Sequence, residues 1–264
     1  MLTFKILRYQ SLPGRRVSRY LAYALGEVIL IVIGILLALQ VNEWNARRAQ
    51  NSESSHYLAR LDAELASHES ELLDQIQLTA VRMESVNVVL RAIERSADEV
   101  DFNRVYEALG HTNNIKQLSL DTSVYAESVN LGKDHLLPDP GLKKALAAYY
   151  AQIEGERNLN DIGLRYHWRQ FYSPFINQYL NAARMHKAWA RQTFGRDLGM
   201  YELDLPVAPL WSLPEDHPVK RQFANELSSY NSGMFYAQWV QEKLLEASGD
   251  IREQIEAFRR GAQR

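Results

Sequence analysis

The chain has 264 residues, with 30 Lys and Arg, 32 Asp and Glu, and no cysteine. This length accommodates one sizeable domain plus a membrane anchor, and the lack of cysteine excludes a disulfide framework and a thiolate metal site. The first twenty residues hold five bases and no acid, so residues 21–264 carry 25 bases against 32 acids. This mildly acidic remainder argues against nucleic acid as a partner, because binding it requires a basic face.

Residues 1–20 form a basic tail that contains Lys5, Arg8, Arg15, Arg16 and Arg19. The positive-inside rule places such a tail in the cytoplasm, with Arg15, Arg16 and Arg19 at the membrane interface. Two interpretations of the segment before Arg15 stay open. It lies along the inner membrane surface, attracted by anionic lipid, or it is a plain topology signal.

Residues 21–41 read LAYALGEVILIVIGILLALQV, and a run of about 20 apolar residues spans a bilayer as one helix. The run exceeds the 7–15 residues typical of a cleaved signal peptide, and no clean small-x-small site follows it. We therefore expect an uncleaved anchor and a single pass, with Trp44 at the outer interface. In a bacterium this places the chain in the inner membrane and residues 42–264 in the periplasm.

The polar and small residues of this helix share one face at 100° per residue. That face holds Tyr20, Tyr23, Glu27, Gly34 and Ala38, and the opposite face holds Leu25, Ile29, Ile33 and Leu36. Small residues let a second helix approach closely, so we predict that the first face docks against another membrane helix. The alternative is that Gly and Ala are simply common in membrane helices.

Glu27 lies six residues from Leu21, about 9 Å along the helix at 1.5 Å per residue, and therefore in the cytoplasmic half. An acid inside a membrane run indicates a function or a partner. Three interpretations compete for Glu27. It is neutral and hydrogen-bonded locally, for instance to Tyr23; it pairs with a group on a partner helix; or it reaches the interface.

Apolar residues recur at three- and four-residue steps beyond residue 42, which predicts a helix continuing from the membrane to about Ser96. Short helices are expected over Asp101–Leu109, closed by Gly110, and over Thr122–Leu131, with Gly132 as its stop. Asp139 suits the N-cap and Pro140 the first turn of a further helix.

That helix is expected to reach about Tyr172, with a kink or restart at Pro174 and an end near Phe194. Residues 195–218 form a Pro-rich loop that we expect to pack on the domain. A last helix begins at Pro218, with a break or weak point at residues 248–250. The predicted fold is all-α, with one N-terminal transmembrane helix continuing into a long-helix antiparallel bundle.

The stretch RYLAYALGEVILIVIGILLALQVNEWN, Arg19–Asn45, carries a family resemblance. It is similar to an uncharacterised family of bacterial single-pass proteins catalogued as domain of unknown function number 6090. The shared features are the Gly26-Glu27 pair, the Ile33-Gly34-Ile35 core and the Gln40–Asn45 exit. Thr122–Tyr150 resembles a second, looser landmark, with Asn130-Leu131-Gly132 in place of a small-residue-glycine step. The family has no established activity, so the resemblance implies topology rather than chemistry.

The sequence contains no nucleophile elbow, phosphate-binding loop or paired zinc histidines. A di-iron bundle needs its Glu-x-x-His step twice, and only Glu53–His56 supplies one. Bases and aromatics interleave from Arg165 to Trp189, so Arg165, Trp168 and Arg169 are candidates for gripping an anion; the alternative is a core of aromatics flanked by arginines. We predict no enzyme, cofactor or metal.

Two functions follow. The first is a structural or accessory protein whose transmembrane helix docks in a membrane assembly. The assembly is a homo-oligomer or a larger complex, for example an energy-transducing one. The second is a periplasmic sensor or small-anion-binding module that signals through a partner protein. The expected partners are the lipid bilayer and a membrane protein or a second copy, without nucleic acid.

Overall fold

The computed structural model describes residues 14–112, 118–133, 136–137, 139–158, 166, 168–196, 199 and 209–262, with the side chains of residues 14–23, 168 and 262 excepted. These residues form helices and connections without a strand, which confirms the all-α prediction. The chain divides into two units, Met1–Ser54 and Ser55–Arg264. Helix α1 spans Gly14–Ile93 without interruption, so the predicted continuous helix is confirmed.

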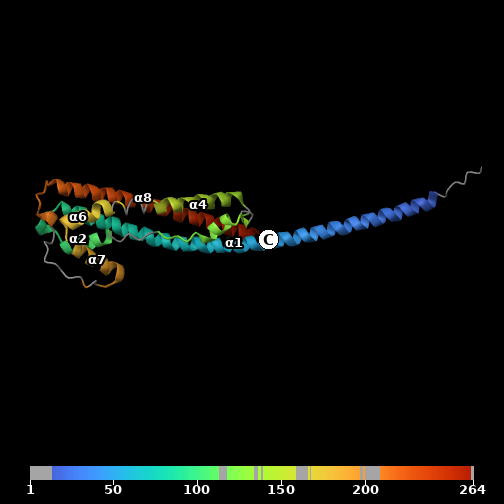
Figure 1. Ribbon diagram of the computed structural model, residues 1–264, viewed down its shortest axis with the longest axis horizontal. Coiled ribbons are helices and arrows are strands. Elements are labelled where there is room, and N and C mark those ends of the chain that lie inside the picture. The colour runs from blue at the N-terminus through green and yellow to red at the C-terminus, as the bar shows by residue number, and fades with distance from the viewer. Residues whose placement is uncertain are drawn as a thin grey trace, which may run out of the picture. The chain divides into compact units, whose positions relative to one another are not determined.

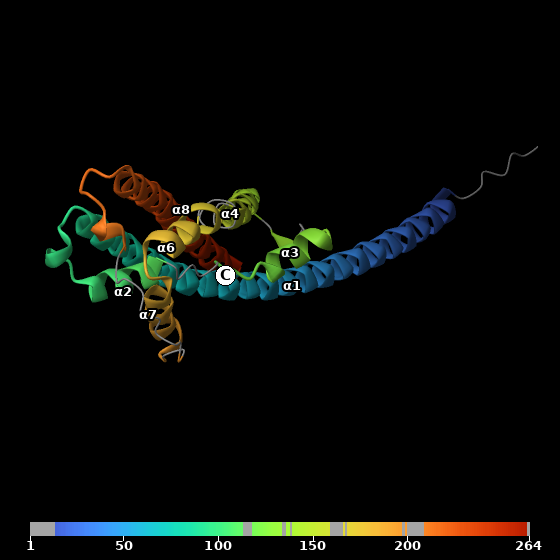
Figure 2. The ribbon, with the colours of Figure 1, turned by 60° about the vertical axis from the view of Figure 1, so that its left-hand side comes forward.

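The second unit is built around α1 and the long C-terminal helix α8, Pro218–Ala262. Figures 1 and 2 show α8 lying along the later part of α1. Ser248 Oγ donates to the carbonyl of Leu65 at 3.3 Å, and Arg252 pairs with Asp62 at 2.8 Å. Further along α1, Asn231 Nδ2 reaches Asn87 Oδ1 at 3.5 Å. Residue numbers fall along α8 as they rise along α1, so the two helices are antiparallel, as predicted.

Helix α4, Pro140–Asn158, packs on α8, and Gln241 Nε2 donates to Glu156 Oε1 at 3.2 Å. Asp139 caps this helix, because its Oδ2 accepts the amide of Leu142 at 2.7 Å. Helix α3, Ser123–Asn130, ends where Gly132 takes φ 61°. The amide of Lys133 then donates to the carbonyl of Ser128 at 2.9 Å, which completes a Schellman motif. The predicted N-cap at Asp139 and the predicted helix stop at Gly132 are therefore confirmed.

A new helix begins beside Pro174, as predicted, and a further break that the sequence did not predict follows it. A π-helical turn, η4 (Trp168–Tyr172), leads into α6, Ser173–Tyr179, where Pro174 lies in the first turn and needs no amide partner. The break falls at Leu180, with extended φ −132°. Asn181 then caps α7, Ala182–Phe194, by accepting the amide of Arg184 at 3.2 Å. Gly195, at φ 66°, ends α7 at the predicted residue.

Gly110 does not end its helix, contrary to the prediction. Helix α2, Phe102–Thr112, continues through it, and Asp101 caps the other end by accepting the amides of Asn103 and Arg104. A Cβ at Gly110 would lie 2.8 Å from the backbone nitrogen of Trp189 and 3.1 Å from the carbonyl carbon of Ala188. The glycine therefore lets the backbones of α2 and α7 approach closely.

The predicted break at residues 248–250 is wrong, because α8 passes through them and buries Ser248 against α1. The preceding loop contains a short 3₁₀ turn, η5 (Pro209–Ser212), with Leu210 and Trp211 buried. Trp211 Nε1 donates to the carbonyl of Ala92 at 2.8 Å. This part of the loop packs on the domain, as expected; Leu205 and Val207 lie outside the described residues.

The core consists of two hydrophobic clusters at different heights of the bundle. The first gathers residues of α2, α6, α7 and η5 around Val86–Ile93 of α1 and Phe223–Met234 of α8. The second gathers α3 and α4 around Tyr57–Leu72 of α1 and Val240–Ile255 of α8. Each cluster is the hydrophobic core of one half of the second unit.

Buried polar side chains occupy the height between these clusters. Gln75, Thr79 and Arg82 of α1, Glu156 of α4 and Gln241 of α8 are all at most 3% exposed. We call these five residues the polar layer. The periodicity of α1 predicted a continuous apolar stripe, but between Leu72 and Val86 the inward positions are polar. The apolar Ile76, which the periodicity placed in the stripe, is only partly buried.

Candidate functional site

The N-terminal unit contains a helical segment suited to a membrane. From residue 24 onward, α1 includes an 18-residue window that is long and apolar enough to cross a bilayer, and none of that window is buried. Large apolar side chains such as Leu25, Leu30 and Leu37 are more than half exposed. A helix pairs its own backbone groups, as a lipid environment requires, so this segment presents an apolar surface without unsatisfied backbone.

The predicted docking residues lie on this helix. Glu27, Gly34 and Ala38 are exposed, and a Cβ built at Gly34 meets no atom within 4 Å. The backbones of Arg15, Arg16, Arg19, Tyr20 and Tyr23 also belong to α1, but their side chains lie outside the described set. The Glu27–Gly34–Ala38 face is thus uncovered in the structure.

Two side-chain pairs, each joining residues one helical turn apart, mark the exit from the apolar segment. Arg48 places its guanidinium carbon 5.6 Å from the ring centroid of Trp44, a cation–π distance. Arg47 and Glu43 form an exposed ion pair at 3.0 Å. An exposed Trp beside charged groups suits a membrane–water interface, so the surroundings of Trp44 are consistent with its predicted position.

The anion site predicted around residue 168 lies largely outside the described residues. Arg169 is exposed on η4, whereas Arg165 and the side chain of Trp168 lie outside the described set. The neighbouring aromatics pack inward instead. Tyr172 is fully buried, and Phe175 stacks on Phe223 at 4.3 Å between ring centroids. These rings serve as core, the alternative that the sequence left open.

A basic groove that the sequence reasoning missed lies between α2 and α7. It has a volume of about 460 Å³ and is lined by Asn103, Tyr106 and Glu107 of α2 and by Arg184, Lys187 and Arg191 of α7. Burial raises the pKa of the Tyr106 phenol, an effect opposed by its hydrogen bond with the Asn181 amide and by the charge of Arg184. The sequence does contain one indication of this basic groove, since residues 182–196 contain four bases and no acid.

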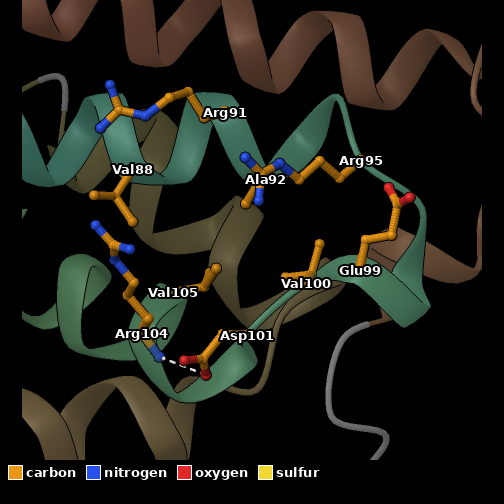
Figure 3. A pocket seen from close by; sticks show the side chains of 9 residues that line it. All are labelled: Val88, Arg91, Ala92, Arg95, Glu99, Val100, Asp101, Arg104 and Val105. Atoms are coloured by element: carbon orange, nitrogen blue, oxygen red, sulfur yellow. Dashed lines mark hydrogen bonds between the residues drawn. The ribbon is translucent and has the colours of Figure 1, made fainter.

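A second, smaller hollow of about 130 Å³ lies where α1 turns into α2. Figure 3 shows Arg91, Arg95 and Arg104 around it, with Glu99 and Asp101 on its rim. Arg91 is already paired with Glu84, and the Asp101 carboxylate holds the α2 amides. The charges around this hollow therefore largely balance.

Hydrogen bonds also link α1 to α3 and α4. Glu64 accepts the amide of Val124 at 2.7 Å and the hydroxyl of Tyr150. Burial, reinforced by Glu64, raises the pKa of Tyr150 far above its ordinary value. Burial lowers the pKa of His68, whose ring contacts Tyr149 and the carbonyl of Asp121. Among the described residues, no three His, Asp or Glu side chains gather in a metal-holding arrangement.

Comparison with known proteins gives one match. The model of the family of unknown function DUF6090 matches residues 27–162, which reach from the apolar segment beyond the end of α4. Neither the curated proteins nor the solved structures include a match to this chain. The match extends the resemblance seen in the N-terminal segment into the helical bundle.

Proposed function

This chain belongs to the family of unknown function DUF6090, and from that premise we propose that it is a non-enzymatic, membrane-anchored accessory protein. Its apolar helix docks against a second membrane helix, either in a copy of itself or in a subunit of a larger complex such as an energy-transducing one. The observation that carries the proposal is that the polar Glu27 and the small Gly34 and Ala38 share one face of this exposed apolar helix.

The composition of this face supports docking. In lipid the hydrophobic effect does not drive helices together, so association depends on close packing and on interhelical hydrogen bonds. Gly34 and Ala38 allow the close packing, and Glu27 supplies a hydrogen-bonding group. A carboxylate within the bilayer costs about 2.5–3.5 kcal/mol at the helix centre on insertion scales, and a partner group on the second helix lowers that cost.

The orientation belongs to the same proposal. The basic tail lies in the cytoplasm, α1 crosses the inner membrane once, and the helical bundle lies in the periplasm. The support is the charge asymmetry: residues 1–20 have five bases and no acid, while the remainder is acidic.

The association is tested by gentle solubilisation followed by size-exclusion chromatography with light scattering. We expect a protein mass above that of one 30.4 kDa chain. Glu27→Leu and Gly34→Leu should insert normally but lower that mass, because they remove the polar group and the close approach. Ile33→Leu on the opposite face is the matched control. A wild-type protein that is a lone monomer would refute the docking role.

The orientation is tested by thiol labelling, which the chain suits because it has no cysteine. In bacterial spheroplasts, a membrane-impermeant maleimide should label Ser229→Cys, an exposed position on α8, and should label Ser11→Cys only after lysis. The reverse pattern would show that the bundle is cytoplasmic.

A further inference from the structure

Residues 118–124, which end in the first turn of α3, are held to the bundle through their backbone. Three side chains bind backbone groups of this segment, namely Arg157 at the Leu120 carbonyl, His68 at the Asp121 carbonyl and Glu64 at the Val124 amide. The donor–acceptor distances are 2.6 Å, 2.6 Å and 2.7 Å, respectively. Side chains of α1 and α4 therefore fix one short segment at three neighbouring points.

His68 is the one of these three side chains whose ordinary pKa, about 6.5, lies near neutral pH. It is 1% exposed, and its Nδ1 lies 3.0 Å from the hydroxyl of Tyr149. Because Nε2 donates to the Asp121 carbonyl, the Nδ1 of a neutral ring accepts from Tyr149. A protonated ring carries a second hydrogen, directed at that hydroxyl. Charging His68 therefore places a buried charge and forces Tyr149 to redirect its own hydrogen.

The surroundings of His68 disfavour that charge. The titratable and charged groups around His68 and Tyr149 come from α1, α4, α8 and the segment itself, namely Glu64, Glu69, Tyr150, Arg157, Arg252 and Asp121. Burial has the largest influence and lowers the pKa of His68, and the charge of Arg157 lowers it further. The hydrogen bond to Asp121 and the charge of Glu64 act in the opposite direction. Neither ring nitrogen bonds to a carboxylate.

We propose that His68 is a pH-sensitive latch, and that protonation of its ring releases residues 118–124 from α1. The rest of α3 stays anchored through Ser128, whose Oγ accepts the hydroxyl of Tyr57 at 2.7 Å. A released ring binds its proton in water without the cost of burial, so release is favoured as the pH falls below about 6.5. The latch is independent of membrane docking, and either proposal can fail without the other.

Hydrogen–deuterium exchange with mass spectrometry on the full chain in detergent tests the latch. Exchange rates are divided by the intrinsic rates at each pH, which gives protection factors. A ring that titrates at about 6.5 when released, and stays neutral when held, raises the released fraction about tenfold between pH 8 and pH 5.5. The peptide covering residues 118–130 should therefore lose protection about tenfold. A loss smaller than twofold in the wild-type chain would overturn the proposal.

A second peptide distinguishes local release from global unfolding. Residues 223–234 of α8 contain buried core positions, and they should be better protected than residues 118–130 at both pH values, since local openings need less free energy than global unfolding. Equal protection of the two peptides at both pH values would mean that the segment opens only with the whole unit, and it would overturn the latch.

Variants then assign the effect to one ring. In His68→Gln, the side-chain amide can donate to the Asp121 carbonyl and accept from Tyr149 without gaining a charge, so residues 118–130 should stay equally protected at both pH values. His111→Gln is the matched control, because burial also lowers the pKa of His111, which lies on α2. It should keep the tenfold loss. A tenfold loss in His68→Gln, or none in His111→Gln, would contradict the assignment. If His68→Gln lacks a native circular dichroism spectrum, the wild-type comparison still decides.

Discussion

Glu64 on α1 accepts the phenolic hydrogen of Tyr150 on α4 through one carboxylate oxygen, and its other oxygen accepts the amide of Val124 at 2.7 Å. One buried carboxylate thereby joins three helices. Hydrogen bonds to a charged group contribute more to stability than neutral ones, about 1.5–3 kcal/mol.

Tyr150→Phe should therefore lower the free energy of unfolding by about 1.5–3 kcal/mol, because Glu64 loses a donor in a buried position. The measurement is urea unfolding followed by circular dichroism. The matched control is Tyr236→Phe, whose exposed hydroxyl has no hydrogen bond to a described residue, and which should leave stability unchanged. Equal effects of the two replacements would argue against a stabilising role for the Glu64 contact.

Gly110→Ala should destabilise the α2–α7 pair by about 1–3 kcal/mol, the usual cost of overpacking. The added Cβ would lie 2.8 Å from a backbone atom of α7, which cannot move away as a flexible side chain can. Gly155 on α4 provides the control, since a Cβ there meets nothing within 4 Å. Gly155→Ala should be neutral or stabilise by up to about 1 kcal/mol through helix propensity. Thermal unfolding of both variants tests the difference.

The second unit should lose stability as the pH falls below about 6.5, the ordinary pKa of histidine. The carbonyl of Asp121 can only accept, so His68 Nε2 donates to it and Nδ1 accepts from Tyr149, which describes a neutral ring. Burial lowers the pKa of His68, and of His111, in the folded chain. The unfolded chain then binds more protons, so the free energy of unfolding rises with pH between the folded and unfolded pKa values.

Urea unfolding at pH 8 and pH 5.5 measures this effect. The free energy of unfolding of the wild-type protein should be lower at pH 5.5 than at pH 8. His68→Gln should reduce this difference in free energy. His56→Gln, at an exposed position, should leave the difference as it is. If His68→Gln keeps the full difference, protonation of His68 is not its source.

Arg82 and Glu156 should be energetically coupled. Burial lowers the pKa of Arg82, and the charge of Glu156 acts in the opposite direction. Arg82→Met should lower the free energy of unfolding by about 1.5–3 kcal/mol, because it removes a charged hydrogen bond with Tyr230 and the cation whose charge favours the Glu156 carboxylate. Arg82→Met with Glu156→Gln should lose less than the two single changes together. A double-mutant cycle from urea unfolding gives the coupling, and additive losses would show that there is none.

Local signals in the sequence predicted the helix ends well. Asp139 and Gly132 act within one or two turns of chain, and each lies at the end of its helix in the structure. Gly110 is the exception, because it was predicted to end α2 and the helix continues through it. A glycine that ends a helix and a glycine that admits a neighbouring backbone have the same sequence signature, and only the position of α7 separates them.

The site residues show the same limit. The apolar segment was readable because length and composition suffice for a membrane helix. The α2–α7 groove was not, because Asn103, Tyr106 and Glu107 are about eighty residues away from the α7 bases that they face. Arg82 was missed since periodicity counts apolar positions and takes no account of an inward-facing base.

The polar layer also restricts how α8 can move along its neighbours. Sliding α8 by one helical turn, about 5.4 Å, would remove Gln241 from Glu156 and bring Ala237 or Leu245 opposite that carboxylate. Neither side chain can donate a hydrogen bond, so the shifted arrangement would leave Glu156 poorly solvated. A piston-like stroke of α8 would therefore lose the Gln241–Glu156 hydrogen bond without a replacement donor, which opposes such a movement in this bundle.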